Sequence, residues 1–177
     1  INSVSFIVDD LAKDSPLIKD LRFFEDQFSG IMPLEIIVDT GIKKGVQNLK
    51  NLQKINEFET FLDEIPYISQ PVSLVSFIKA ARQAFYNQNP NFYSLPNQRD
   101  LGFILKYLAL QPDEAGFSQN FVDENKQKMR ISLKVADIGS NKMDSLISEV
   151  IMPKIESLFA DTKMNLAVTG TTITFIK

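Results

Sequence analysis

The sequence predicts an α+β fold, and three observations support this. Two short strand patterns each end in an Asp-x-Gly turn that leads into a long helical pattern, first at residues 39–41 and again at 137–139. Two more helical patterns lie between these units, and neither can bury its apolar stripe alone. Together they predict one domain, a ferredoxin-like β-α-β/β-α-β antiparallel sheet with helices on one face and a helical-hairpin insert.

Residues 1–30 are expected to form a lead-in and a first helix. Residues 4–10 alternate loosely between apolar and polar side chains. Ser15 is a favourable N-cap and Pro16 suits the first helical position, so a helix is predicted over Pro16–Phe28. Its apolar stripe is Leu17, Ile18, Leu21, Phe24 and Phe28, and Gly30 supplies the stop.

Residues 34–72 are expected to form the first β-α-β unit. The β-branched run 33–39 predicts a buried central strand. A helix is predicted over 45–65, with its core stripe at Ile55, Phe58, Phe61, Leu62 and Ile65. Val46, Leu49 and Leu52 drift off this stripe, so the first turns are expected to pack elsewhere. Residues 67–72 form a weak strand candidate that Pro71 restricts to an edge.

Residues 73–110 are expected to form the helical insert. The first helix is predicted over 73–86, with Leu74, Phe77, Ile78, Ala81 and Phe85 as its stripe. A polar loop follows at 87–91. After Pro96, the spacing of Leu101, Ile104, Leu105 and Leu108 predicts a second helix. The two helices should pack together as a hairpin.

Residues 117–170 are expected to form a β-hairpin and the second half of the sheet. Strands are predicted over 117–122 and 129–136, and strict alternation makes the second one half-buried. Ser140 is expected to cap a helix in which Pro153 forces a kink or a short break. A last strand is predicted over 164–168. Residues 171–177 are expected to lead from it toward the next segment of a longer parent chain.

Composition narrows the possible functions. The chain contains no His and no Cys, which removes the common catalytic triads, most zinc sites and thiolate chemistry. A formal net charge of −3 argues against a nucleic-acid-binding face. No uninterrupted apolar run is long enough for a membrane helix. An enzyme, a cofactor and a metal ion are therefore not expected.

Four acidic residues are candidates for proton transfer or for binding a divalent ion. Asp9 and Asp10 stand together, and Asp39 and Asp137 follow the two strands. Paired carboxylates can transfer protons or bind a divalent ion. Each of these residues instead lies in a turn or a charged lead-in, so a structural role is expected. Nor do the glycines after the strands form a phosphate-binding fingerprint.

Aromatic residues give the best candidates for ligand contact. Phe85, Tyr86, Phe92 and Tyr93 cluster around the polar loop of the hairpin. They could line a cleft for an amphipathic ligand, or they could be core and cap residues of the hairpin. Phe85, Phe92 and Tyr93 are the candidate substrate contacts. No Lys/Arg interleaving supports stacking on nucleic-acid bases.

The order of segments resembles a known family. Residues 23–30 read Phe-Phe-Glu-Asp-Gln-Phe-Ser-Gly and lead at once into the strand at 32–39, while residues 166–170 read Leu-Ala-Val-Thr-Gly. This is similar to the extracytoplasmic loops of resistance-nodulation-division (RND) exporters, in the branch of the mycobacterial large membrane proteins (MMPL). In that family a Phe-x-x-x-Phe-Gly-Gly helix end precedes the first porter strand. Here Ser29-Gly30 replaces Gly-Gly.

The resemblance implies a ferredoxin-like porter domain in the periplasm, belonging to an inner-membrane exporter. It implies three partners: the transmembrane bundle of the same parent protein, its second periplasmic loop, and an amphipathic or lipid-like small molecule. The parent could form an oligomer. The family's proton relay lies in the transmembrane bundle, so no relay residue is carried over to this chain.

Two other functions stay open from the sequence. One is a stand-alone ligand-binding or sensor domain of ferredoxin-like fold, with the aromatic cluster as its pocket. The other is an enzyme that uses carboxylates and Lys, which no convergent acid-base set supports. The apolar-rich end after Thr169 leads to the expectation that the piece is excised from a longer chain.

Overall fold

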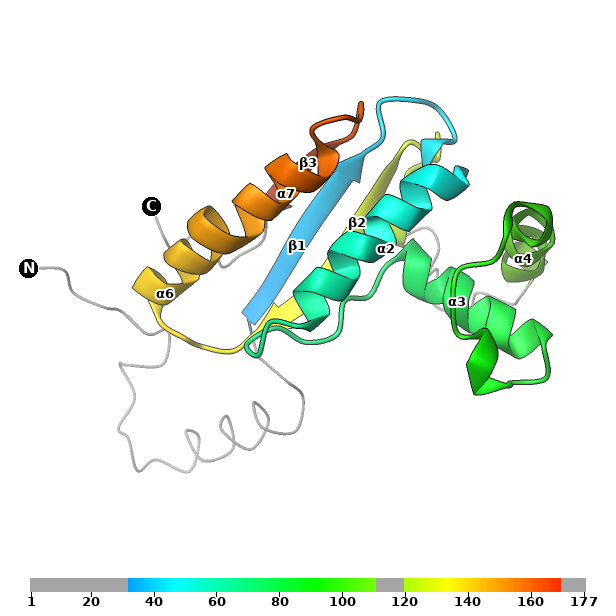
Figure 1. Ribbon diagram of the computed structural model, residues 1–177, viewed down its shortest axis with the longest axis horizontal. Coiled ribbons are helices and arrows are strands. Elements are labelled where there is room, and N and C mark those ends of the chain that lie inside the picture. Colours follow the sequence, from blue (N-terminus) through cyan, green and yellow to red (C-terminus); the bar gives the residue numbers. More distant parts are fainter. Residues whose placement is uncertain (1–31, 111–119, 170–177) are drawn as a thin grey trace, which may run out of the picture.

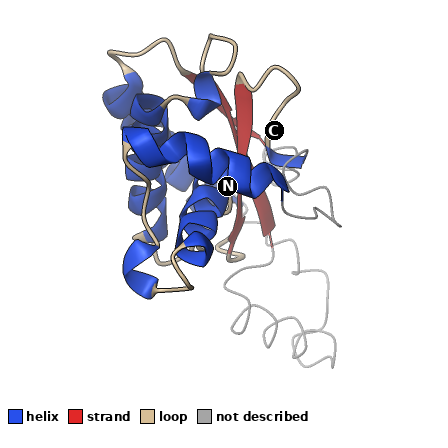
Figure 2. Ribbon diagram, turned by 90° about the vertical axis from the view of Figure 1, so that its right-hand side faces the viewer, coloured by secondary structure: helices blue, strands red, loops and turns tan. Residues whose placement is uncertain are grey.

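The computed structural model describes residues 32–110 and 120–169, and it confirms the α+β class. Three strands, β1 (Met32–Asp39), β2 (Lys128–Val135) and β3 (Asn165–Thr169), form an antiparallel sheet in the order β2-β1-β3. Helices cover one side of this sheet, and a helical hairpin projects beside it (Figures 1 and 2). The first helix predicted at 16–28, with Phe24, and the segment 171–177 lie outside the described residues.

The three strands follow the alternation of their sequences. Ile36 of β1 pairs with Ile131 of β2 and with Val168 of β3. Every second residue of β1 and β2 is buried, starting at Met32 and Met129. The strands predicted at 33–39, 129–136 and 164–168 are thus confirmed. β1 is central in the sheet, but only one of its faces is fully buried, because the helices lie on that face.

The opposite face of the sheet carries several polar side chains. On this face Ser132 lies opposite Glu35, and its hydroxyl donates to Glu35 Oε1 at 3.0 Å. Arg130 Nε lies 3.4 Å from Glu35 Oε2, and Lys128 Nζ lies 3.4 Å from Asp39 Oδ2. Such partly exposed ion pairs contribute little to stability. Their position explains why the polar residues alternate with the core residues.

The segment 67–72 joins the sheet only through two bridges. Ile68 pairs with Val135 and Val72 pairs with Ser132, both antiparallel, along the outer edge of β2. Pro71 lacks an N–H between these points, so a regular ladder cannot form. This matches the expected weak edge strand at 67–72. The described sheet has three strands, and the complete ferredoxin-like pattern stays a prediction.

Three helices of the described residues agree with the sequence patterns, and their caps explain where they begin. A 3₁₀ turn, η1 (Gly45–Gln47), precedes α2 (Leu49–Asp63), and Asn48 Oδ1 accepts the Lys50 N–H at 2.9 Å. Ser73 caps α3 (Leu74–Phe85), and Asn97 accepts the first N–H groups of α4 (Gln98–Leu110). These bonds satisfy N–H groups that have no partner inside the helix.

The long helix near the C-terminus changes type before Pro153. It runs as α6 (Ser140–Ser145), a π-helical segment η3 (Leu146–Ile151) and α7 (Met152–Phe159). Pro153 cannot donate a hydrogen bond to the preceding turn, and its ring would collide with that turn in a regular α-helix. The wider π turn relieves this conflict. The predicted disturbance is confirmed, but the cap position is Gly139 rather than Ser140.

Two further predictions are corrected by packing. The strand expected at 117–122 is wrong for its described part, because Asn120 and Phe121 are helical and Val122 makes one bridge to Met129. Phe121 is buried with its ring edge against Phe77 of α3, 5.2 Å between centroids, and this contact favours the helical turn.

The early residues Val46 and Leu52 were expected to pack elsewhere, yet both are fully buried in the common core. The extended backbone of Asn48 separates the 3₁₀ turn η1 from α2, so the two do not form one continuous helix. The position of Val46 is therefore not set by the helical spacing of the α2 stripe, and its side chain enters the common core.

Candidate functional site

The helical hairpin of α3 and α4 carries the aromatic residues that the sequence singled out. Ile78 and Ala81 of α3 and Leu101 and Ile104 of α4 are buried, so the two helices share one apolar interface. Residues 86–97 connect them through a 3₁₀ turn, η2 (Pro90–Phe92). Figure 1 shows the hairpin at one end of the molecule, beyond the edge of the sheet.

Arg82 fixes the connection between the two helices. Its Nη1 donates to the hydroxyl of Ser94 and, at 3.1 Å, to the carbonyl oxygen of Leu95. Its guanidinium also lies over the ring of Phe92, 5.4 Å from the centroid. These contacts hold the η2 segment against the C-terminal half of α3, so the rings around it are held in place by the fold.

The aromatic rings form a continuous row. The Tyr86 and Phe92 rings stack with their centroids 4.2 Å apart and their planes 14° apart. Phe85 meets Tyr86 edge-on at 5.2 Å and Tyr107 of α4 edge-on at 5.7 Å. Ring pairs at these separations attract each other beyond the apolar area they bury. We name these four residues, Phe85, Tyr86, Phe92 and Tyr107, the ring cluster.

The ring cluster is a surface feature rather than part of the core. Phe85 is 49% exposed, and Phe92, Tyr86 and Tyr107 are half-buried. Of the three predicted contact residues, the structure brings Phe85 and Phe92 together through Tyr86. Tyr93, 42% exposed, lies beside the cluster with Lys79 Nζ 5.9 Å from its ring centroid. Phe85 and Tyr93 are therefore not core residues, whereas their packing around the hairpin loop agrees with a role as cap residues. Ligand contact by Phe85, Phe92 and Tyr93 stays a prediction.

Sequence reasoning missed two contributions to this surface. Tyr107 lies outside the apolar stripe of α4, and its contact with Phe85 arises only when the hairpin packs. The cations were missed as well: no Lys/Arg interleaving was recognised among the rings, yet the fold places Lys79 and Arg82 on two of them. Lys79 and Arg82 precede Tyr86 by seven and four residues on one helix face, which was the available signal.

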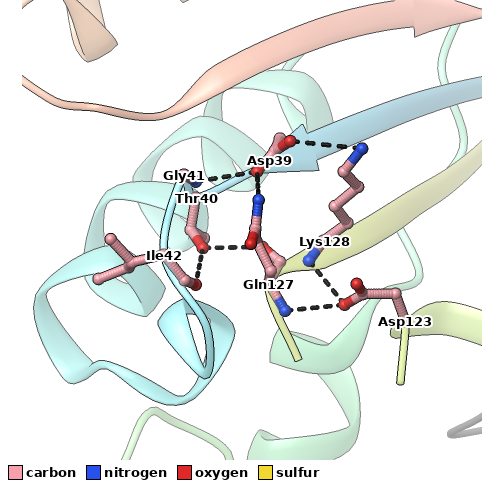
Figure 3. A network of polar contacts seen from close by, with 7 residues as sticks. All are labelled: Asp39, Thr40, Gly41, Ile42, Asp123, Gln127 and Lys128. Atoms are coloured by element: carbon pink, nitrogen blue, oxygen red, sulfur yellow. Dashed lines mark hydrogen bonds and ion pairs between the residues drawn. The ribbon is translucent and has the colours of Figure 1, made fainter. Parts of the chain in front are cut away.

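Asp39 has a structural role at the end of β1 (Figure 3). Its Oδ1 accepts the Gly41 N–H at 2.9 Å and the Gln127 side-chain amide at 2.8 Å. The bond from Gln127, then that from Gly41, and then Lys128 lower the pKa of Asp39. Each partner favours the ionised form, so the carboxylate is committed to the turn and is a poor proton acceptor.

The second Asp-x-Gly turn repeats this arrangement. Asp137 Oδ1 accepts the Gly139 N–H at 3.3 Å. Gly41 and Gly139 have φ values of 71° and 80°, a region that side chains other than Gly rarely adopt. The near-repeat read from the sequence is thus the same turn used twice, as predicted. Asp9 and Asp10 lie outside the described residues.

Thr40 joins the same network, and its side chain leaves no room for a Cβ at position 45. Its buried hydroxyl lies 2.7 Å from the carbonyl oxygen of Gln127 and 3.1 Å from that of Ile42 (Figure 3). Asp123 Oδ1 accepts the N–H groups of Gln127 and Lys128. The loop after β1 and the turn before β2 are therefore closed onto each other by side chains from both.

We expect Gly45→Ala to lower the free energy of unfolding by about 2 kcal/mol. A Cβ at this position would lie 2.0 Å from Thr40 Oγ1 and 2.9 Å from Ile42 Cγ1, so the Thr40 network must move. Gly102→Ala is the matched control, since its Cβ would meet nothing within 4 Å, and it should stabilise α4 by about 1 kcal/mol. Urea denaturation measures both. Equal effects of the two substitutions would contradict the steric account.

Glu59 is a buried acid that sequence reasoning missed. It is 5% exposed on α2 and accepts the hydroxyl hydrogen of Ser73, the residue that caps α3. Burial raises the pKa of Glu59 to about 7, while Ser73 and Lys79 act in the opposite direction. Glu59 follows Ile55 by four residues and precedes Leu62 by three, so it borders the core stripe. This spacing was the signal in the sequence that could have indicated its burial.

The comparisons with known proteins assign no family. No family model matches the chain, and no curated protein matches it either. Among residues 32–110 and 120–169, no group of three or more acidic side chains is placed to hold a metal ion. Over the same ranges, no helix combines the length and hydropathy that a membrane span requires.

Proposed function

We propose that this chain is a periplasmic porter domain of a proton-driven RND exporter in the MMPL-like branch. It accepts and guides a lipid-like or amphipathic substrate and catalyses no reaction. The observation that carries the proposal is the exposed ring cluster, held on a hairpin inserted between β1–α2 and β2–α7–β3. The order of these elements fits the segment order on which the family resemblance rests.

The ring cluster suits an amphipathic ligand. Its rings provide apolar contact area, while Asn87, Gln88 and Asn89 of the adjoining loop are exposed polar groups. A ligand with an apolar tail and a polar head can satisfy both at once. Binding to this domain alone should be weak, because only one side of the ligand is covered and association itself costs free energy.

The partners follow from the same proposal. The transmembrane bundle of the parent protein carries the proton relay, and a second periplasmic loop completes the substrate path. Changes of protonation in the bundle would then shift the domain between states that hold and release substrate. The parent reading frame tests this: a hydrophobic span on each side and a second similar loop support the exporter, and their absence supports a stand-alone ligand-binding domain.

Phe85→Ser should weaken binding of octyl glucoside, used below its micelle concentration, by about tenfold. The ring is half exposed, so its loss removes ligand contact with little effect on the core. Tyr67→Ser is the matched control, because Tyr67 is equally exposed at 50% but lies outside the hairpin. Intrinsic tyrosine fluorescence of each variant follows the titration. A wild-type affinity in Phe85→Ser would rule out the ring cluster as the contact.

A further inference from the structure

We propose that the outer face of α4 docks on the surface of an anionic lipid bilayer. Arg99, Phe103 and Lys106 follow one another at spacings of four and three residues, so they share one face of the helix. The opposite face is formed by Leu101 and Ile104, which are buried in the hairpin. The outer face therefore has an aromatic ring between two cations and points away from the core.

Phe103 is 69% exposed, the largest value among the large apolar side chains of the described residues. Tyr107 lies one turn further along α4 and contacts Phe85, so the apolar surface continues from Phe103 into the ring cluster. Exposed apolar side chains in one patch mark an interaction site, whereas scattered ones do not. An aromatic ring beside long basic side chains is typical of helices that lie in a membrane interface.

Charge supports an anionic partner. Residues 74–110 contain four basic side chains, Lys79, Arg82, Arg99 and Lys106, and one acidic side chain, Asp100. The whole chain has the opposite sign, with a formal net charge of −3. The hairpin is therefore the positively charged end of an acidic protein. Basic groups near a surface of anionic lipids each add to the attraction.

Gly102 leaves the outer face flat. It is exposed within α4, and a Cβ built at this position would meet no atom within 4 Å. Glycine in a helix interior costs stability relative to alanine, so its presence calls for a reason. On this face, a missing side chain between Arg99 and Lys106 lets the helix approach a planar surface closely.

This docking goes beyond the proposed function. It depends on the outer face of α4 and not on whether the chain belongs to an exporter. Within an exporter it would let the ring cluster receive an amphipathic molecule directly from the membrane. Single-stranded nucleic acid is the other polyanion that rings and cations can bind. The bilayer is favoured because Phe103 shares its helix face with Arg99 and Lys106, whose aliphatic stems can lie in the apolar layer with their charges in water.

Co-sedimentation of the full chain with vesicles tests the docking. With phosphatidylcholine vesicles containing 30% phosphatidylglycerol we expect binding that 0.5 M NaCl largely removes, and with pure phosphatidylcholine we expect much less. Phe103→Ser should weaken binding to the anionic vesicles about tenfold. Val150→Ser is the control and should not weaken it, because it alters a 39% exposed apolar residue of the π-helical segment η3, far from α4 in the sequence.

A second pair of variants keeps the test independent of folding. Gly102→Glu adds a negative charge to the outer face and should weaken binding to the anionic vesicles about fivefold. Gly102→Gln has the same shape without the charge, so it shows the steric effect alone and should weaken binding less than Gly102→Glu does. Both replace glycine by a better helix former, so α4 should remain folded.

Several results would overturn the docking. Equal binding to neutral and anionic vesicles would remove the charge argument, and equal loss in Phe103→Ser and Val150→Ser would remove the assigned face. Displacement of the protein from the vesicles by a twenty-nucleotide oligothymidylate, added at the same total negative charge as the lipid, would favour nucleic acid as the partner. Lipid-free self-association lost in Phe103→Ser would favour a second copy. Binding of monomeric octyl glucoside without vesicle binding would contradict the docking and still support the proposed substrate contact.

Discussion

Phe58→Ala should lower the free energy of unfolding by about 4 kcal/mol. Phe58 is fully buried on α2, where its ring meets Phe159 of α7 edge-on at 5.8 Å and stacks with Phe61 at 6.3 Å. It therefore joins the two helices that cover the sheet. Removing the ring leaves a cavity that the rigid neighbours fill only in part. Guanidinium denaturation followed by circular dichroism measures the change.

Phe103→Ala is the matched control for Phe58→Ala. It removes the same atoms from an exposed position, so the free energy of unfolding should change by less than about 0.5 kcal/mol. Phe58→Leu should recover part of the loss, since it fills part of the cavity. A loss below about 1 kcal/mol for Phe58→Ala would mean that α2 and α7 do not pack through this ring.

Glu59→Gln should remove a pH dependence of stability that the native protein shows between about pH 4.5 and 7. The pKa of Glu59 is raised from 4.5 to about 7 by burial, so the folded state holds its proton where the unfolded state loses it. The contribution of Glu59 to the free energy of unfolding is therefore largest below pH 4.5. The stability of the native protein falls as the pH rises, by about 3 kcal/mol in total.

Urea denaturation at pH 5 and pH 8 measures this effect. At pH 8 Glu59→Gln should be more stable than the native protein, because no charge then has to be buried beside Ser73. Glu57→Gln is the control, since Glu57 is exposed on the same helix and its replacement should leave the pH profile unchanged. A native profile that is flat between pH 5 and 8, or equal shifts in both variants, would contradict a buried acid at position 59.

Local patterns allowed much of the fold to be predicted. The alternation of β2 from Met129 to Val135 requires only that one face be buried, and the structure buries that face. The turns at Asp39 and Asp137 depend on atoms within three residues, so their hydrogen bonds with Gly41 and Gly139 were predictable. Pro153 likewise acts within its own helix.

Features that depend on distant contacts were not predictable in the same way. The helical turn at Asn120 and Phe121 replaced an expected strand because Phe121 packs against Phe77, more than forty residues earlier. Val46 lies in the core because the extended residue Asn48 interrupts the helix between η1 and α2, and apolar spacing alone does not reveal this interruption. Propensity sets a weak preference that such packing overrides.

The candidate site combines both cases. Phe85, Phe92 and Tyr93 could be selected from the sequence because they surround one polar loop. Their arrangement could not, since the row of rings needs Tyr107 from α4 and the cations need the register of the two helices. Phe103 was missed because an exposed aromatic residue on one helix gives no signal until the opposite face is known to be buried.

The central claim is that this domain meets amphipathic molecules at the hairpin, and amide chemical-shift mapping tests it most directly. The isotope-labelled chain is titrated with octyl glucoside, a short-chain amphiphile that stays monomeric in the millimolar range, below its micelle concentration. We expect shifts concentrated at residues 79–107, around the ring cluster, with weak saturation in the millimolar range. Shifts confined to the Gly41 and Gly139 turns, with none at the hairpin, would contradict the claim.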